Sequence, residues 1–264
     1  MKFEIKTNQH GWNLRTSVHI NSSFYDVEGF LKGKSTLNFP EREFLSDVFR
    51  KKLLHLQCHF GLDTLSFSRM GAETVGVDLS SEAINYAKIL CKKSNINSQF
   101  IIGDVHQLSQ YIAANTFDII YSSYGVICWL YDLDIWAKEI FKVLKKNGEF
   151  VLIEFHPILD YVYNGNISGK LQYFSDGQTV CEETTGTYTD RESPIKYSEY
   201  RWKHNLADVV SALLNTTMKL EKMKEYPYTP FKLFEDLDIN NKFGWSNSSN
   251  KNQYPYLYAL KFRK

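Results

Sequence analysis

The sequence lacks several features that mark whole classes of protein. Its 264 residues include only four cysteines, at positions 58, 91, 128 and 181, without a CxxC pair or Cys/His ligand spacing. Neither a metal site nor a disulfide framework is therefore predicted. No apolar run approaches the roughly 20 residues of a membrane-spanning helix. Residues 1–6 have no apolar stretch typical of a signal peptide, so we expect a cytoplasmic protein.

An excess of charge of either sign is also absent. Lys and Arg total 31 and Asp and Glu total 30, which leaves a net charge of +1. Nucleic acids and anionic membranes are bound through basic surfaces, so neither is an expected partner. Aromatic residues are abundant instead, at 15% of the chain, with groups in residues 157–203 and 226–258. Such segments line a pocket for an organic ligand or pack as a cover layer, and composition leaves both interpretations open.

Short apolar strands alternate with amphipathic helices over residues 51–156. The strands are predicted at 53–56, 74–77, 100–102, 117–121 and 150–153. The helices are predicted at 62–70, from the cap at Ser80 to about 93, and from about 133 to a left-handed stop at 145–148. This alternation indicates a parallel sheet covered on both faces. Ligands of such sheets bind outside the carboxyl ends of the strands.

The segments on either side of this core are less regular. Residues 1–50 are predicted to form short helices. Residues 157–203 are predicted to form one or two hairpins, with alternating stretches such as 170–174. An apolar stripe of Leu and Val at 206–214 predicts a helix. Residues 217–226 and 254–262 are predicted to form a final antiparallel strand pair.

Polar residues follow three of the predicted strands. Gly61 lies where the chain turns into a helix, and such a turn offers backbone N–H groups to an anion. Asp78, 17 positions further on, is placed to bind both hydroxyls of a ribose, and Asp104 to accept a hydrogen bond from a base amine. Gln57 and His59 stand where a dinucleotide fingerprint has glycines, which argues against NAD or FAD. These positions predict a bound nucleoside with a small anionic end.

Five stretches, in their order and spacing, resemble the motifs of the class I S-adenosylmethionine-dependent methyltransferases. They are residues 53–61, 75–80, 103–105, 117–124 and 144–150. The first departs from the family pattern at His55, where an acid is usual, and at Gln57 and His59, where glycines are usual. The resemblance implies S-adenosylmethionine as cofactor and S-adenosylhomocysteine as product.

The resemblance also implies the α/β fold class and its parts. The fold would be a Rossmann-like sheet of seven strands with helices on both faces, an antiparallel last strand and a β-rich lid inserted after the fifth strand. Residues 1–264 would form one domain. Its parts would be a helical N-terminal lid at 1–50, a cofactor-binding core at 51–156, a substrate-side insertion at 157–203, and a C-terminal helix and strand pair at 204–264.

Individual residues acquire roles from the same resemblance. The expected cofactor-binding residues are Gln57, Cys58, His59 and Gly61 at the amino-acid end, Ser35 at its tail, Asp78 at the ribose, Leu79, Asp104 and Val105 at the adenine, and Ser122 near the sulfonium. A small buried hydrophobe beside the turn is an equally good interpretation of Cys58.

A sulfonium methyl is already activated, so its transfer needs mainly orientation and exclusion of water. A base assists if the acceptor arrives protonated. His156, beyond the fifth strand, is the predicted base, with Glu154 as the alternative acid or cation partner and Tyr124 as a third catalytic candidate near the sulfonium. The alternative for His156 is a strand-end histidine with hydrogen-bonded nitrogens.

Three further residues are predicted to contact the substrate. Trp129, with Tyr124, would form an aromatic wall beside a cationic or planar acceptor. Tyr25 and Arg15 belong to the N-terminal segment, and Arg15 would bind a substrate carboxylate. Packing under the insertion is the alternative for the aromatic pair, and a surface position the alternative for Arg15.

Four functions remain open at this point. The favoured one is methyl transfer to nitrogen, oxygen or carboxylate of a small organic substrate by in-line displacement, in a monomer or homodimer. The others are an RNA- or protein-directed methyltransferase, a nucleotide-linked oxidoreductase, and a non-catalytic S-adenosylmethionine-binding protein. The missing glycines disfavour the oxidoreductase, and the charge balance disfavours a nucleic-acid substrate.

Overall fold

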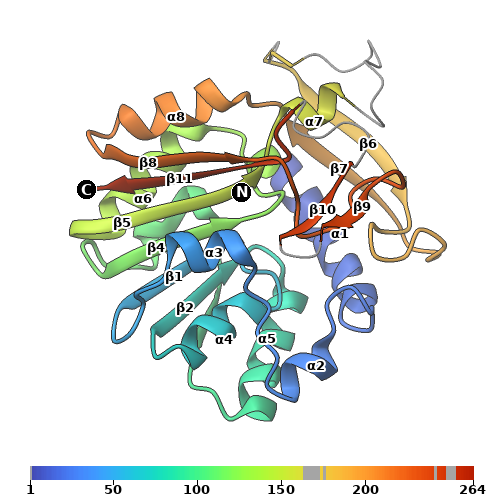
Figure 1. The fold of residues 1–264 in the computed structure, drawn as a ribbon, viewed down its shortest axis with the longest axis horizontal. Coiled ribbons are helices and arrows are strands. Elements are labelled where there is room, and N and C mark those ends of the chain that lie inside the picture. The colour runs from blue at the N-terminus through green and yellow to red at the C-terminus, as the bar shows by residue number, and fades with distance from the viewer. Residues whose placement is uncertain (1, 163–172, 175–176, 241–242, 248–253) are drawn as a thin grey trace.

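A seven-stranded sheet forms the centre of the computed structural model, which describes residues 2–162, 173–174, 177–240, 243–247 and 254–264 (Figure 1). In spatial order the strands are β3 (Gln99–Ile102), β2 (Glu73–Asp78), β1 (Lys52–Leu56), β4 (Phe117–Ser123), β5 (Leu144–Phe155), β11 (Leu257–Arg263) and β8 (Lys219–Tyr226). The first five are parallel, and β11 runs antiparallel to both of its neighbours. The predicted sheet with an antiparallel last strand is therefore confirmed.

Helices cover both faces of this sheet because alternate residues of the inner strands point to opposite sides. Leu54 and Ile120 pack with α6 (Leu133–Val143) and α8 (Leu206–Leu214). Leu53 and Tyr121 face the other way, into a cluster with α3 (Phe39–Phe44). The remaining core helices are α4 (Leu62–Arg69) and α5 (Ser81–Ser94). No helix in the described ranges is long and apolar enough to cross a membrane.

Local signals locate most element boundaries correctly. Ser80 caps α5, with its hydroxyl accepting a hydrogen bond from the Ala83 N–H at 3.1 Å. The end predicted for α6 is wrong. That helix ends at Val143, and β5 begins at once because Leu144 pairs with the start of β4. The left-handed residue in the following turn is Asn147, with φ 62°, rather than glycine.

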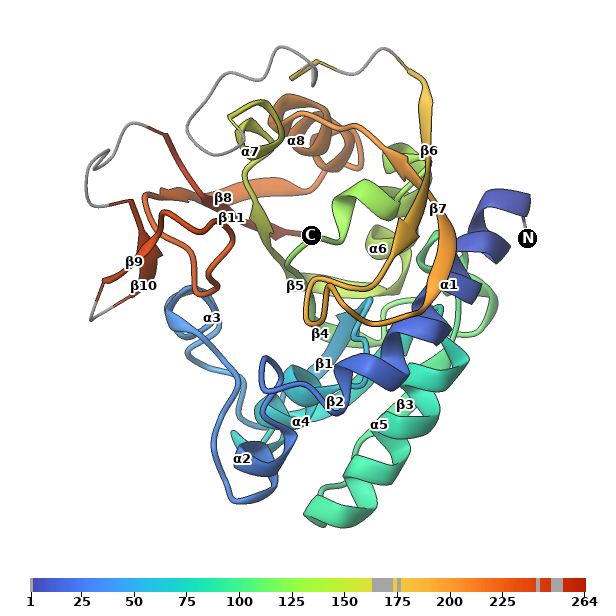
Figure 2. The same cartoon turned by 90° about the vertical axis from the view of Figure 1, so that its right-hand side faces the viewer.

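The N-terminal segment and the insertion lie beside each other at one end of the molecule. The N-terminal helices are α1 (Phe3–His19), α2 (Val27–Leu31) and α3, and α1, with 17 residues, is longer than expected. The insertion contains α7 (Ile158–Tyr161) and one hairpin, β6 (Thr179–Thr185) with β7 (Lys196–Trp202). Figure 2 shows α1 running alongside β7 and α5. Residues 170–174, whose alternating apolar and polar pattern supported the predicted hairpins, lie mostly outside the described residues.

A second small hairpin was not predicted from the sequence. It pairs β9 (Asp238–Asn240) with β10 (Gly244–Ser246), next to the sheet face that carries α3 (Figure 2).

At position 61, between β1 and α4, both the backbone conformation and the neighbouring side chains require a glycine. Its φ is +80°, a region that costs other residues about 1–2 kcal/mol. A Cβ at this position would lie 2.5 Å from the Phe100 ring and 3.3 Å from Ala87. The aromatic ring packs directly on the glycine, so the turn has no room for a side chain.

We predict that Gly61→Ala lowers the free energy of unfolding by more than Gly33→Ala does. Gly33 also has positive φ, at +103°, but a Cβ there meets nothing within 4 Å. Both variants lose about 1–2 kcal/mol to backbone strain. Gly61→Ala loses about 1–3 kcal/mol more to overpacking against Phe100. Urea unfolding of the two variants measures this difference, and equal losses would contradict the packing argument.

Candidate active site

In the turn after β1, every second residue has a left-handed backbone conformation. Gln57, His59 and Gly61 have φ values of 52°, 50° and 80°, which explains physically why glycine suits these positions. The turn is held by three hydrogen bonds. Gln57 Nε2 donates to the Val126 carbonyl at 3.0 Å, Cys58 N–H to the Val77 carbonyl at 3.0 Å, and His59 N–H to Asp78 at 2.7 Å. Tertiary contacts thus keep two bulky residues in an unfavourable conformation.

Asp78 ends β2 and joins this turn to the next helix. Its Oδ2 accepts the His59 N–H and its Oδ1 accepts the Ser80 N–H at 2.8 Å. Burial raises the pKa of Asp78 to about 6, although these backbone hydrogen bonds oppose the shift. A carboxylate has about four acceptor positions, so Asp78 keeps capacity for a ribose hydroxyl.

Three buried polar atoms at the ends of β1 and β4 have no hydrogen-bond partner in the described part of the chain. They are Gln57 Oε1, His59 Nδ1 and Ser122 Oγ. Ser122 pairs in register with Leu56, so β4 ends beside the turn. Buried polar groups without partners are rare in proteins. These atoms could form hydrogen bonds with a ligand that has hydroxyl, amino and carboxylate groups. S-adenosylmethionine, the cofactor that the motif resemblance implies, has all three.

The residues expected around the adenine lie at the ends of β2 and β3. Asp104 accepts hydrogen bonds from the backbone N–H and the ring Nδ1 of His106, both at 2.9 Å. Burial would raise the pKa of Asp104, but these bonds bring it below its usual value. Val105 is buried in the core, and Leu79 is half-buried.

Cys58 packs as a small hydrophobe. Its Sγ lies 2.7 Å from the place where a Cβ on Gly76 would stand, and burial raises the pKa of the thiol well above its usual value. Its side chain therefore stays neutral beneath the turn, and a cofactor would contact Cys58 only through the backbone. No cluster of three metal-ligating side chains occurs among the described residues.

Helix α1 lies across the carboxyl ends of β1 and β2. Asn13 Oδ1 accepts a hydrogen bond from Ser80 Oγ at 2.7 Å, and Gln9 Nε2 donates to the Leu79 carbonyl at 2.8 Å. His19 Nδ1 and His59 Nε2 are 2.8 Å apart. Burial lowers the pKa of His19 to about 3, so this imidazole stays neutral. The helix thus contacts the turn and the start of α5 directly.

Arg15 occupies a different place from the one expected. It is buried, forms an ion pair with Glu199 on β7, and stacks over Trp12 and Trp129 at 4.5 and 5.2 Å. Its charge is neutralised by Glu199 within the protein, and its expected role in binding a substrate carboxylate stays a prediction. Arg15 attaches α1 to the hairpin through this ion pair with Glu199 on β7.

A group of aromatic side chains, here called the aromatic wall, lies on the side of the site where the acceptor is expected; it comprises Phe24, Tyr25, Tyr124, Tyr188 and Phe231. Tyr25 contacts Tyr188 through their hydroxyls, and its ring lies 5.4 Å from that of His59. Phe231 packs edge-on against Tyr124 at 5.1 Å and stacks on Phe24 at 5.2 Å. Phe24 and Phe231 were not among the predicted residues, although the aromatic-rich segment 226–258 was the signal that could have found Phe231.

His156, the predicted base, has the hydrogen-bonded nitrogens of the strand-end alternative, and its catalytic role stays a prediction. Its Nε2 lies 3.1 Å from Glu225 on β8, and its Nδ1 accepts the Ile158 N–H at 3.1 Å. Both ring nitrogens are therefore engaged, and the ring points toward the β8 edge of the sheet. The sequence predicted the two strands beyond β5 but not that β8 would bring Glu225 beside His156.

Glu154, a predicted catalytic candidate, forms hydrogen bonds with the backbone of the loop after β4. Its two oxygens accept hydrogen bonds from four backbone N–H groups, those of Gly125, Val126, Ile127 and Phe155. Burial raises the pKa of Glu154 despite these bonds. The carboxylate fixes the loop after β4, which includes Tyr124, and has little capacity left for a substrate.

Ser35 is also used within its own loop. It is exposed, and its hydroxyl accepts the Leu37 N–H at 3.3 Å. The next residue, Thr36, is the one that reaches α4, by donating a hydrogen bond to Asp63 at 2.5 Å.

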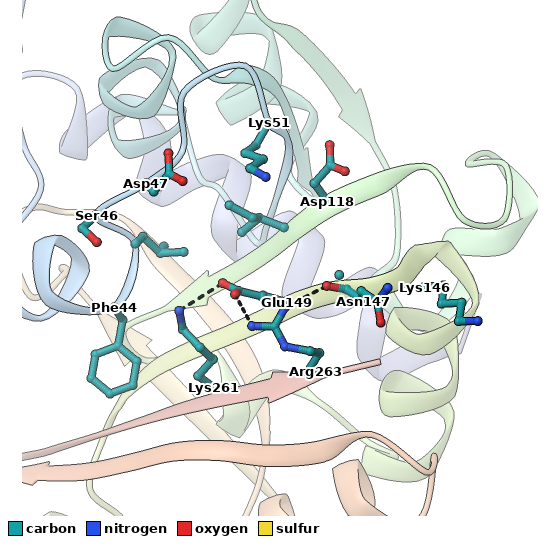
Figure 3. Close-up of a pocket in the computed structure, with 13 residues that line it drawn as sticks. Phe44, Ser46, Asp47, Lys51, Asp118, Lys146, Asn147, Glu149, Lys261 and Arg263 are labelled. Carbon is teal, nitrogen blue, oxygen red and sulfur yellow. Dashed lines mark hydrogen bonds and ion pairs between the residues drawn. The ribbon is translucent and has the colours of Figure 1, made fainter.

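A cavity of about 360 Å³ lies at the opposite end of the sheet, near the amino ends of β1 and β4 (Figure 3). Lys51 and Asp118 lie on its rim, and Lys261 and Arg263 form ion pairs with Glu149 in its wall. It is distant from the carboxyl ends of the strands and takes no part in the candidate site.

The strand order is that of the methyltransferase sheet, with the turn after β1 and the acid after β2 at the carboxyl ends of its strands. Residues 54–152 match a family model described as a methyltransferase domain. Over these residues, which include the turn after β1 and the acid after β2, the chain is similar to methyltransferase domains, in agreement with the resemblance of its motifs to the class I S-adenosylmethionine-dependent methyltransferases.

Two curated relatives are named ubiquinone biosynthesis O-methyltransferase. The one from Pelagibacter ubique is 31% identical over 135 residues, which cover 51% of this chain and 55% of that protein. The one from Pseudoalteromonas translucida is 27% identical over 86 residues, which cover 31% and 36%. The matches thus span about half or less of each relative's length.

Solved structures share the fold. A methyltransferase from Mesorhizobium loti is 16% identical with a TM-score of 0.59, covering 89% of this chain and all (100%) of that one. One from Clostridium acetobutylicum is 14% identical with a TM-score of 0.57, covering 93% and 94%.

We predict that Glu154→Gln lowers the free energy of unfolding by about 2–4 kcal/mol. The amide nitrogen cannot accept a hydrogen bond, so buried N–H groups of the loop lose their partner. Glu149→Gln, on the same strand, is the control. Glu149 pairs with Lys261 and Arg263 near the surface, where loss of ion pairs costs about 1 kcal/mol or less. Urea unfolding that shows equal losses would contradict the structural role of Glu154.

Proposed function

We propose that the protein transfers a methyl group from S-adenosylmethionine to a small organic acceptor by in-line displacement, at the carboxyl ends of β1 and β4. The observation that carries this proposal is the set of buried, unpartnered polar atoms of Gln57, His59 and Ser122 beside the Asp78 carboxylate. The cofactor, when bound, supplies an activated methyl group.

The chain's own residues would bind and orient the cofactor. Asp78 would accept the ribose hydroxyls, and the turn at 57–61 would hold the amino-acid end. Leu79, Asp104 and Val105 would flank the adenine. Ser122 would lie near the reacting end because it stands at the carboxyl end of β4, beside the turn. Helix α1 would exclude water from the same edge.

The acceptor side favours a small, largely apolar molecule. Tyr25, Tyr124 and Phe231 offer ring surfaces there, and aromatic side chains commonly line pockets for organic ligands. The net charge of +1 gives no support to a nucleic-acid substrate. The similarity to two proteins named O-methyltransferases of ubiquinone biosynthesis supports oxygen as the acceptor atom.

We predict that Asp78→Asn weakens the binding of S-adenosylhomocysteine about 10- to 100-fold. The amide loses one charged acceptor for the ribose hydroxyls, and hydrogen bonds to charged groups contribute about 1.5–3 kcal/mol. Glu73→Gln, at the exposed start of the same strand, is the matched control and should bind like the unmodified protein. Isothermal titration calorimetry measures both. Unchanged affinity of Asp78→Asn would show that the ribose lies elsewhere.

A further inference from the structure

Glu41, on α3, is a buried carboxyl that the sequence motifs do not involve. Its side chain is fully buried, at 0% exposure. Its Oε1 accepts the Tyr121 hydroxyl at 3.0 Å, and its Oε2 accepts the Asn38 N–H at 3.1 Å. No Lys or Arg in the described ranges forms an ion pair with it. A buried carboxyl without a cationic partner is costly to maintain, which suggests a use for it.

The second observation is the hydroxyl of Tyr124. Tyr124 follows β4 in a left-handed conformation, with φ 48°, and its ring belongs to the aromatic wall. Its hydroxyl is buried and has no hydrogen-bond partner among the described residues. Burial raises the pKa of Tyr124 well above its usual value, and the nearby Glu41 carboxyl acts in the same direction. One side chain therefore connects the acceptor side of the site to a buried proton-accepting group.

The groups around Glu41 leave it able to exchange a proton near neutral pH. Burial raises the pKa of Glu41 to about 7, and the nearby Asp63 acts in the same direction, while the hydrogen bond from the Tyr121 hydroxyl opposes the shift. Tyr226, the other titratable group facing this region, hydrogen-bonds to the separate carboxylate of Glu43. None of these neighbours carries a positive charge, so Glu41 is anionic only above about neutral pH.

We propose that Glu41 receives, through the Tyr124 hydroxyl, the proton that an aryl hydroxyl acceptor loses as it is methylated. This inference rests on the proposed function. Tyr124 would be the catalytic residue in contact with the acceptor, and Glu41 the positioning residue behind it. The two residues would replace His156 and Glu154, whose polar atoms are engaged elsewhere.

The proton and electron balance of this step is complete. The acceptor O–H bond breaks and its proton passes to Tyr124 Oη, while the original Tyr124 proton passes to a Glu41 carboxylate oxygen. The acceptor oxygen forms the new bond to the methyl carbon, and the sulfur keeps the electron pair of the broken C–S bond. Tyr124 is restored as a neutral phenol, and Glu41 releases its proton to solvent when the product leaves.

The test compares Glu41→Gln, Tyr124→Phe and their double variant with Glu43→Gln. Glu43 lies on the same helix and is paired with Lys222 and Lys224, so its variant is a matched control. Catechol serves as the acceptor probe, with methyl transfer followed from about pH 5.5 to 9. Calorimetry with S-adenosylhomocysteine and infrared difference spectra of the carboxyl band give readouts independent of turnover.

We expect kcat of the unmodified protein to rise with pH through a midpoint near 7, because Glu41 must be deprotonated to accept the proton. Glu41→Gln should lower kcat about 100-fold and abolish that rise. Tyr124→Phe should do the same, with no further loss in the double variant because the two residues act in series. The affinity for S-adenosylhomocysteine should stay within threefold, and Glu43→Gln should behave as the unmodified protein.

The infrared spectra test the proton acceptor directly. The band of the protonated Glu41 carboxyl should be present at low pH and fade as the pH rises through about 7. Since its pKa is raised by folding, Glu41 contributes less stability as pH rises from 4.5 to 7. The glutamine variant, which cannot ionise, should therefore fold at least as well above this range.

Two kinds of failure can be told apart. If the unmodified protein binds no S-adenosylhomocysteine, the proposed function fails, and this inference with it. If it binds the nucleoside but leaves catechol unmethylated, or if Glu41→Gln keeps the original kcat and pH profile, the proton route through Tyr124 is wrong.

Discussion

The candidate site depends on the backbone of one turn, between β1 and α4. Its alternating left-handed residues point the chain's polar groups toward the carboxyl edge of the sheet, and two of them, Gln57 and His59, carry full side chains. That conformation persists because Asp78 and the loop after β4 hydrogen-bond to it. The strain at this turn is thus maintained by tertiary contacts, as is common at binding sites.

Three buried carboxyls near this edge differ in what surrounds them, and their roles follow from that difference. Four backbone N–H groups saturate Glu154, so it holds a loop. Asp78 receives two and keeps capacity for a ligand. Glu41 receives one backbone N–H and one tyrosine hydroxyl, and it lies near the Tyr124 hydroxyl, which has no hydrogen-bond partner among the described residues. The same functional group thus gives an anchor, a ligand-binding group and a candidate proton acceptor, according to its partners.

The N-terminal helix and the inserted hairpin are joined by a buried ion pair rather than by apolar packing alone. Arg15 on α1 pairs with Glu199 on β7, and Trp12 and Trp129 stack on the guanidinium. Removing one partner of such a pair leaves an uncompensated buried charge, so the two segments are specified together. Both segments lie over the carboxyl ends of β1 and β2, so their aromatic side chains are next to the polar groups at these strand ends.

The sequence by itself determined the α/β core, because strand periodicity, helix caps such as Ser80 and the left-handed turn at Gly61 before α4 are local signals. It also located Asp78 at a strand end, since the end of an apolar run marks the edge of a parallel sheet. Only the tertiary structure decided which polar groups are free. His156 is engaged because β8 brings Glu225 beside it, and Glu41 becomes a candidate because α3 packs it against β4. These outcomes depend on residues far apart in the chain, and no local pattern encodes which side chains will meet.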